Sequence, residues 1–151
     1  MNNLDTIEAS RLDDENRRLA FTIFRFTLGV NFFVHGGIRL VTGLETFVDN
    51  MKGGFSESPL PSVLVVGFLY VLPFVEVALG LLLILGAWTR RALPAGGLLM
   101  AGLMFGAGSK QDRGAVGWQM VYAIAFFLLL SHARHDGLGL DWWRRQRDVR
   151  G

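Results

Sequence analysis

Four long apolar segments, separated by short polar stretches, follow one another along the chain. They cover residues 19–41, 62–88, 92–108 and 115–131, and the second contains one charged residue, Glu76. The last two segments contain no charged residue. A helix rises ~1.5 Å per residue and needs about 20 apolar residues to cross the ~30 Å hydrocarbon layer. The pattern predicts an all-α integral membrane protein, built as a bundle of four transmembrane helices.

The loop between the first two segments, residues 42–61, has a helical pattern of its own. Four of its apolar residues are spaced i, i+3, i+4 and i+7, as on one face of a helix: Leu44, Phe47, Val48 and Met51. Gly53 and Gly54 then end the pattern. We expect a short amphipathic helix on the membrane surface, either a connector that covers the bundle or a lid over a site that opens to the membrane.

The positive charges are distributed unequally between the two sides of such a bundle. Ten of the fifteen Lys and Arg residues lie in residues 1–18, in the loop after the second span and in the segment after the fourth. Because positive charge stays on the cytoplasmic side, we expect a cytoplasmic N-terminal segment (1–18), a membrane domain (19–141) and a basic cytoplasmic tail (142–151). The first segment is too acidic for a signal peptide, so the first span is expected to remain as an anchor.

The composition excludes several classes of function. The chain of 151 residues is 51% hydrophobic and 19% charged, and it contains no Cys. Without Cys there is no disulfide, no Cys-ligated zinc and no iron–sulfur cluster, so any redox chemistry needs a borrowed cofactor. The net charge of +2 does not indicate nucleic-acid binding, because most of the Arg residues lie beside the apolar segments, where topology explains them.

The polar residues of the first span share one side of the helix. At 100° per residue, Arg25, Asn31, His35 and Arg39 fall within about a third of the circumference, together with Phe32. A charged residue costs about 2.5 to 3.5 kcal/mol in the middle of the membrane on insertion scales, so this face is expected to avoid lipid. It must contact other helices or a polar or ligand-filled cavity.

Glu76 is the acid that this polar face could meet, and two interpretations remain open. In the structural one, Arg25 and Glu76 form an ion pair that fixes the packing of the first two spans. In the functional one, the face binds a quinone: Arg25, His35 and Arg39 donate to its carbonyls, Phe32 flanks its ring, and Glu76 relays a proton. His35 and Glu76 are then the candidate catalytic residues, because both exchange protons. The candidate quinone-binding residues are Arg25, Asn31, Phe32, His35, Arg39 and Glu76.

The three histidines do not favour a haem or a metal site. His35 lies towards the outer end of the first span, whereas His132 and His135 follow the fourth span at the other side, about 20 Å or more away by helical rise. One haem cannot bridge that separation. His132, His135 and Asp136 have the spacing of metal ligands, but a solvated helix end explains them better, so no metal is predicted.

Two motifs in these spans resemble the DoxX family of small four-span membrane proteins. One is Arg25-x3-Gly29 followed by His35-Gly36 with a basic residue at 39, and the other is Glu76-x3-Gly80-Leu81 continuing through Gly86 to Thr89-Arg90. The ending Gly139-Leu140-Asp141 is a weaker third match. Arg39 stands where Lys is usual in the family, and the Gly-Pro pair usual after His is missing. The resemblance implies a four-helix bundle and a link to quinone-dependent oxidoreductases, including the membrane subunit of thiosulfate:quinone oxidoreductase.

The sequence therefore predicts an integral membrane, quinone-binding subunit of a redox system, with membrane lipid and other membrane or peripheral redox subunits as partners. Its expected location is the plasma (inner) membrane of a bacterium, with both termini in the cytoplasm. The alternative is a non-catalytic assembly or scaffold subunit that packs through glycine-rich helix faces into a larger complex. A small carrier or proton path is the third interpretation.

Overall fold

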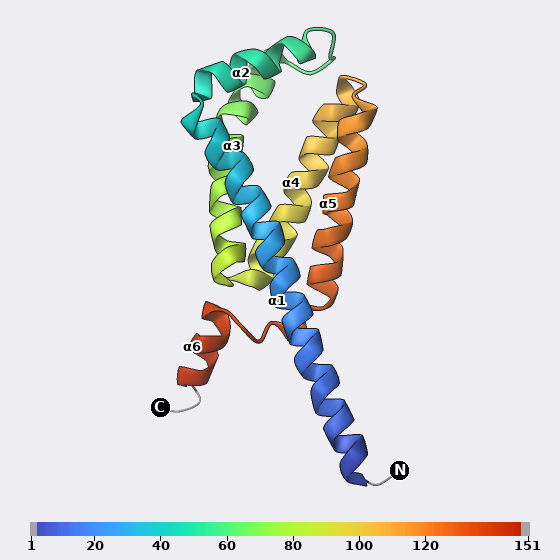
Figure 1. The fold of residues 1–151 in the computed structure, drawn as a ribbon. Helices are drawn as coiled ribbons and strands as arrows, with labels where there is room; N and C mark the ends of the chain where they lie inside the picture. Colours follow the sequence, from blue (N-terminus) through green and yellow to red (C-terminus); the bar gives the residue numbers. More distant parts are fainter. Residues whose placement is uncertain (1–2, 149–151) are drawn as a thin grey trace.

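The computed structural model of the protein describes residues 3–148, with side chains for residues 7–143, 146 and 147. These residues form helices and turns, without a strand (Figure 1). The long helices are α1 (Asn3–Val41), α3 (Ser62–Leu85), α4 (Thr89–Ser109) and α5 (Arg113–Ser131). The shorter ones are α2 (Leu44–Lys52), η1 (Gly53–Phe55), η2 (Ala133–His135) and α6 (Leu140–Asp148).

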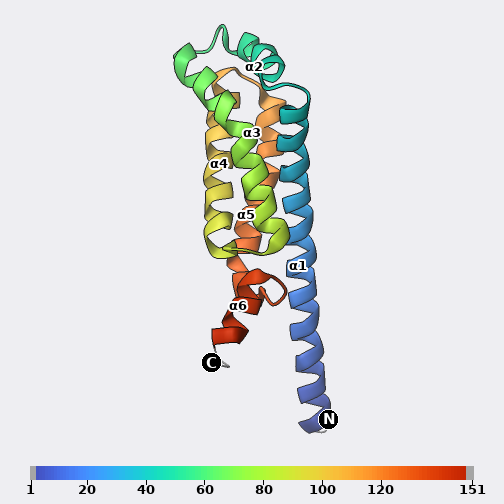
Figure 2. The same cartoon turned by 90° about the vertical axis from the view of Figure 1, so that its left-hand side faces the viewer.

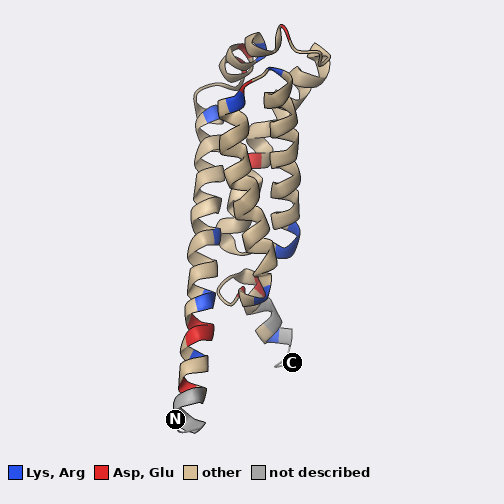
Figure 3. Cartoon of the chain, turned by 90° about the vertical axis from the view of Figure 1, so that its right-hand side faces the viewer, with Lys and Arg blue, Asp and Glu red and all other residues tan. Residues whose placement is uncertain are grey.

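The long helices cross a membrane and form one bundle. In the described part of the chain, α1, α3, α4 and α5 are the four helices long and apolar enough to do so. Figure 2 shows them side by side, with both chain ends beyond one end of the bundle and α2 across the other. Charged residues gather towards these two ends (Figure 3). The protein is a multi-pass, all-α membrane protein, as the apolar segments predict.

Glycine allows α1 and α3 to pack closely as an antiparallel pair. A Cβ atom on Gly36 would lie 2.6 Å from the carbonyl oxygen of Pro73, and one on Gly80 would lie 2.5 Å from the backbone nitrogen of Phe33. Neither distance is possible for a real side chain, so these positions require glycine. The same contacts fix which residues of the two helices lie at the same level.

The second pair consists of α4 and α5. The two pairs meet in the half of the bundle nearer the chain ends, where Leu28, Phe32, Leu83, Leu93 and Leu129 are buried in one core. Phe32 of α1 contacts Tyr122 and Phe126 of α5 edge to face, with ring centroids 6.0 and 5.5 Å apart. Towards the other end the pairs diverge, and α2 lies across the opening (Figure 1).

The amphipathic helix predicted in the first loop is confirmed as α2. Val48 is buried against Val65 and Leu69 of α3, and Phe47 and Met51 pack against the same small core. Helix α2 follows Gly43, whose φ of 104° is available to glycine at little cost. The apolar face of α2 is therefore turned towards the bundle and not towards solvent.

The largest difference from the predicted bounds is at the start of the first span. The helix of the first span continues back to Asn3 through the predicted N-terminal segment, because neither Gly nor Pro occurs before Gly29 and Asp13 pairs with Arg17 at 2.9 Å. The predicted basic tail begins inside α6, where Arg147 stacks on Trp143 at 4.9 Å. The side chains of Arg144 and Arg145, and all of Arg150, lie outside the described residues.

Candidate functional site

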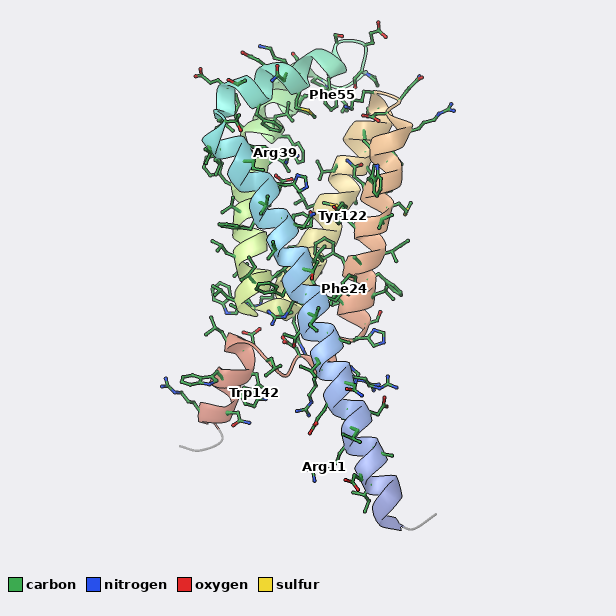
Figure 4. All side chains as sticks on the ribbon, viewed as in Figure 1. Arg11, Phe24, Arg39, Phe55, Tyr122 and Trp142 are labelled. Carbon is green, nitrogen blue, oxygen red and sulfur yellow. The ribbon has the colours of Figure 1, made fainter. Side chains whose placement is uncertain are left out.

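A cavity of about 690 Å³ lies between the two helix pairs, beneath α2. Its walls are mostly apolar side chains from α2, α3 and α4, among them Met51, Leu69, Leu72, Met100 and Leu103. Figure 4 shows Arg39, Phe55 and Tyr122, from α1, η1 and α5, in this region of the molecule. Five of the six residues predicted to bind a ligand line the cavity: Asn31, Phe32, His35, Arg39 and Glu76.

An ion pair between Glu76 and Arg39 lies in the wall of the cavity. The Arg39 guanidinium donates to the Glu76 carboxylate, and the two side chains are 27% and 6% exposed. The guanidinium also lies 4.9 Å from the centre of the Phe47 ring, so Arg39 connects the acid on α3 to the helix that covers the cavity. A charged carboxylate within the membrane is thereby compensated without leaving the cavity wall.

His35 lies beside this pair and is free to bind a ligand. Its side chain is exposed, it lines the cavity, and it makes no hydrogen bond to any residue that the structure describes. It is close enough to Glu76 for their charges to interact. An imidazole in this position can donate to, or accept from, a group that enters the cavity.

Helix α5 contributes two polar residues that the sequence analysis did not select, Gln119 and Tyr122. Both line the cavity, and the Oε1 atom of Gln119 is buried without a hydrogen-bond partner among the described residues. Since Phe32 contacts the Tyr122 ring, these residues lie near the level of His35 on the facing helix. Their spacing of three residues, which puts both on one face of an apolar helix, is the signal that could have identified them.

The end of the cavity farthest from the chain termini is bordered by a second ion pair. Lys110 Nζ lies 3.1 Å from a carboxylate oxygen of Asp112 and 5.5 Å from the centre of the Phe55 ring. Asp112 also accepts a hydrogen bond from the backbone N–H of Ala115 and so caps α5. That backbone bond, followed by the bond from Lys110, holds the pKa of Asp112 below its usual range.

Apolar residues of α3 and α4 that line the cavity are also exposed on the outside of the bundle. Leu64 and Phe68 of α3 and Phe105 of α4 line the cavity, and their side chains are 68%, 41% and 68% exposed. Leu64 lies near the start of α3 and Phe105 near the end of the antiparallel α4, so both belong to the same end of the bundle. The cavity therefore has an apolar border on this side of the bundle.

The predicted contact between Arg25 and Glu76 is wrong, and Arg25 does not line the cavity. The glycine contacts place Glu76 level with Gly36, one turn from Arg39, whereas Arg25 lies beside the far end of α3. There it is 2% exposed and donates to the carbonyl oxygens of Leu83 and Leu138, at 2.5 and 2.6 Å. Its Nε atom is 3.8 Å from the Asp136 carboxylate.

The surroundings of Arg25 tie the end of the chain to the bundle. The Asp141 carboxylate accepts from the backbone N–H groups of Trp88 and Thr89, at 2.9 and 2.8 Å, and so caps α4. The Asp141 N–H donates in turn to the carbonyl oxygen of Gly86. The Arg25 guanidinium packs against the Cα side of the same glycine, where a Cβ atom would be. Arg25 therefore has a structural role and is removed from the candidate ligand-binding residues.

The described residues contain no group of three or more His, Cys, Asp and Glu arranged to hold a metal ion. His132 and His135 stack on one another, with ring centroids 6.1 Å apart, outside the cavity. Comparisons of the chain with protein-family models, with curated proteins and with solved structures return no match. The resemblance to the DoxX family stays a prediction, and the function is argued from the cavity.

Proposed function

We propose that the protein is a quinone-binding membrane subunit of a redox system. The observation that supports this most is the cavity, because polar groups that can exchange hydrogen bonds and protons stand in a largely apolar space with an exposed apolar border. Its volume of about 690 Å³ falls within the usual range for small-molecule sites. A quinone has this combination of features: a ring with two carbonyl groups and an apolar tail.

The polar residues of the cavity suit both forms of such a ligand. His35, Asn31 and Tyr122 offer donors to carbonyl oxygens, and the unpartnered Oε1 of Gln119 offers an acceptor to a hydroxyl group. When bound, a quinone would accept or release electrons together with protons. Phe32 would lie against the ring, since it forms part of the cavity wall between α1 and α5.

The proposed roles of His35 and Glu76 follow from their surroundings. His35 Nδ1 or Nε2 holds or delivers a proton at a ligand oxygen, because the imidazole has no other hydrogen-bond partner among the described residues. Glu76 receives a proton from His35 or returns one to it, and Arg39 holds the carboxylate in place. In this proposal a partner subunit supplies or takes up the electrons, and this Cys-free chain has no thiolate to hold an iron–sulfur cluster of its own.

The variant His35→Phe tests this proposal, because it keeps a planar ring and removes both nitrogens. We expect the purified protein to keep its fold but to lose most of the quinone that wild-type protein retains when it is extracted with native lipid. The matched control is His132→Phe, since His132 is exposed, lies outside the cavity and bonds only to the Leu128 carbonyl of its own helix turn. Quinone in the extracts is measured by chromatography.

The alternative function, a scaffold subunit, predicts the opposite result. Equal quinone in wild type and in well-folded His35→Phe would remove His35 from the site. If wild-type protein extracted with native lipid retains no quinone, the cavity does not bind quinone and the scaffold interpretation is preferred.

A further inference from the structure

A second, polar pocket lies at the end of the bundle where the chain termini are found. It has a volume of about 500 Å³ and is formed by the part of α1 before the membrane span and by the turn after α5. Its lining consists of Asp13, Asp14, Arg17, Arg18, Arg134 and His135. This pocket is separate from the quinone site and shares no lining residue with it.

The cationic groups of this pocket are only partly compensated by the protein. Arg17 is paired with Asp13 at 2.9 Å, whereas Arg18 and Arg134 have no ion pair or side-chain hydrogen bond with any residue that the structure describes. Three arginines against two aspartates leave the lining with a net positive charge. The unpaired guanidinium groups can therefore receive a further anion.

His135 adds a buried group to the same pocket. Its side chain is 9% exposed, and its Nδ1 atom is buried without a hydrogen-bond partner among the described residues. A buried polar atom without a partner costs free energy. A ligand that forms a hydrogen bond to it would therefore gain binding free energy in addition to that from its charge. His135 is therefore a pocket residue with an unmet hydrogen bond.

The position of the pocket identifies the source of the anion. Arg17 and Arg18 directly precede the apolar segment that begins at residue 19, and α1 first becomes buried in the bundle at Phe21. The guanidinium groups therefore lie at the depth of lipid headgroups, where basic residues bind anionic phosphates. We infer that Arg18, Arg134 and His135 form a binding site for the phosphate group of an anionic phospholipid.

The site also explains how the turn after α5 is held against α1. A Cβ atom on Gly137 would lie 2.9 Å from the Cδ atom of Arg18, so the stem of Arg18 packs directly on this turn. A phosphate that bridges Arg18 on α1 and Arg134 on η2 would join the two segments through its oxygens. Bound lipid is therefore expected to stabilise the protein against thermal unfolding.

The test measures the thermal midpoint of purified protein in detergent micelles that contain phosphatidylglycerol, phosphatidylcholine or inorganic phosphate at equal concentrations. We expect phosphatidylglycerol alone to raise the midpoint. Arg134 is exposed, so Arg134→Gln should preserve the fold. In this variant the phosphatidylglycerol concentration that gives half of the rise in the midpoint should increase roughly fivefold, the value expected for the loss of one guanidinium near the membrane surface. Adding Arg18→Gln should raise it further.

The matched control is Arg91→Gln, because Arg91 is also exposed, lies at the same end of the bundle and does not line the pocket. An unchanged phosphatidylglycerol effect in Arg91→Gln supports the site. The inference is overturned if Arg91→Gln weakens the effect as much as Arg134→Gln does, since general surface charge would then explain it. It is also overturned if inorganic phosphate protects as well as the lipid, or if phosphatidylglycerol has no effect on wild type.

Discussion

Arg25 and Arg39 show how two similar residues on one helix face acquire different roles. Both lie on the polar side of α1, and Arg25 was the one expected from the sequence to reach Glu76. Which one does depends on how far α1 is shifted along α3, and that shift is set by backbone contacts at Gly36 and Gly80. Helical periodicity gives the direction of a side chain around its own axis, but it does not give the register between two helices.

A double-mutant cycle tests the observed pairing. Because Arg39 is partly exposed, Glu76→Gln is expected to destabilise the protein by about 1 to 3 kcal/mol, less than the loss of one partner of a fully buried pair. The double variant Glu76→Gln with Arg39→Gln should be destabilised by less than the sum of the two single variants. The difference should be at least about 0.5 kcal/mol, because the two residues are in contact. The free energy of unfolding is measured in detergent with a denaturant.

Arg25→Gln provides the comparison for that cycle. Arg25 is buried and bonds to Leu83 and Leu138, so its replacement should cost about 3 to 5 kcal/mol, as when a buried charged group loses its partners. The loss of stability in Arg25→Gln should add to the loss in Glu76→Gln, since Arg25 and Glu76 are not paired. Coupling of Glu76 to Arg25 and not to Arg39 would contradict the register seen in the structure.

Among the helices, those with a strong periodic signal were predicted from the sequence. The four apolar segments became α1, α3, α4 and α5, and three of the four spaced apolar residues of the first loop, Phe47, Val48 and Met51, became the inward face of α2. The extension of α1 and the helix α6 were missed, because both segments are rich in charged residues and such a composition is also typical of solvated chain ends. The sequence left a ligand-filled cavity as one possibility beside the polar face of α1, but its place and shape could not be predicted, because they depend on how the two helix pairs diverge (Figure 1).

The cap of α5 makes its stability depend on pH. The pKa of Asp112 is lowered on folding by the bond from Ala115 and by Lys110, so protonation of this carboxyl favours the unfolded state. Its stabilising effect is complete above the ordinary pKa of about 4 and is lost as the pH falls through the lowered value. Asp112→Ala should therefore lower the thermal midpoint at pH 7, and the difference from wild type should shrink in acid.

Asp49→Ala is the control for this effect. Asp49 forms an exposed ion pair with Lys52 on α2, at 2.6 Å, and does not cap a helix. Surface pairs of this kind contribute little, so the midpoint at pH 7 should change less than in Asp112→Ala. A difference between Asp112→Ala and wild type that persists unchanged in acid would show that the carboxylate is not responsible.

For the whole molecule, the arrangement of the helices determines which parts share one side of the membrane. Both chain ends lie beyond one end of the bundle and α2 lies at the other (Figure 2). The two pockets follow this division: the cavity proposed to bind quinone lies beneath α2, and the pocket proposed to bind phosphate lies at the end with the termini. The fold does not identify which end is cytoplasmic, so the orientation depends on the distribution of positive charge.

Cysteine labelling decides that orientation, and the chain is suited to it because it contains no Cys. Asn50 lies exposed on α2 and Gln146 lies exposed on α6, so single cysteines at these positions report on opposite ends of the bundle. Ten of the fifteen basic residues belong to the side of the termini, which the positive-inside rule assigns to the cytoplasm. In intact cells an impermeant thiol reagent should label Asn50→Cys and should label Gln146→Cys only after the membrane is opened. The reverse pattern would place the pocket formed by Arg18, Arg134 and His135 on the outer side and would contradict the assignment from charge. Equal labelling of both from outside would contradict the four-span fold itself, since the three spans between the two reporters, α3, α4 and α5, place them on different sides.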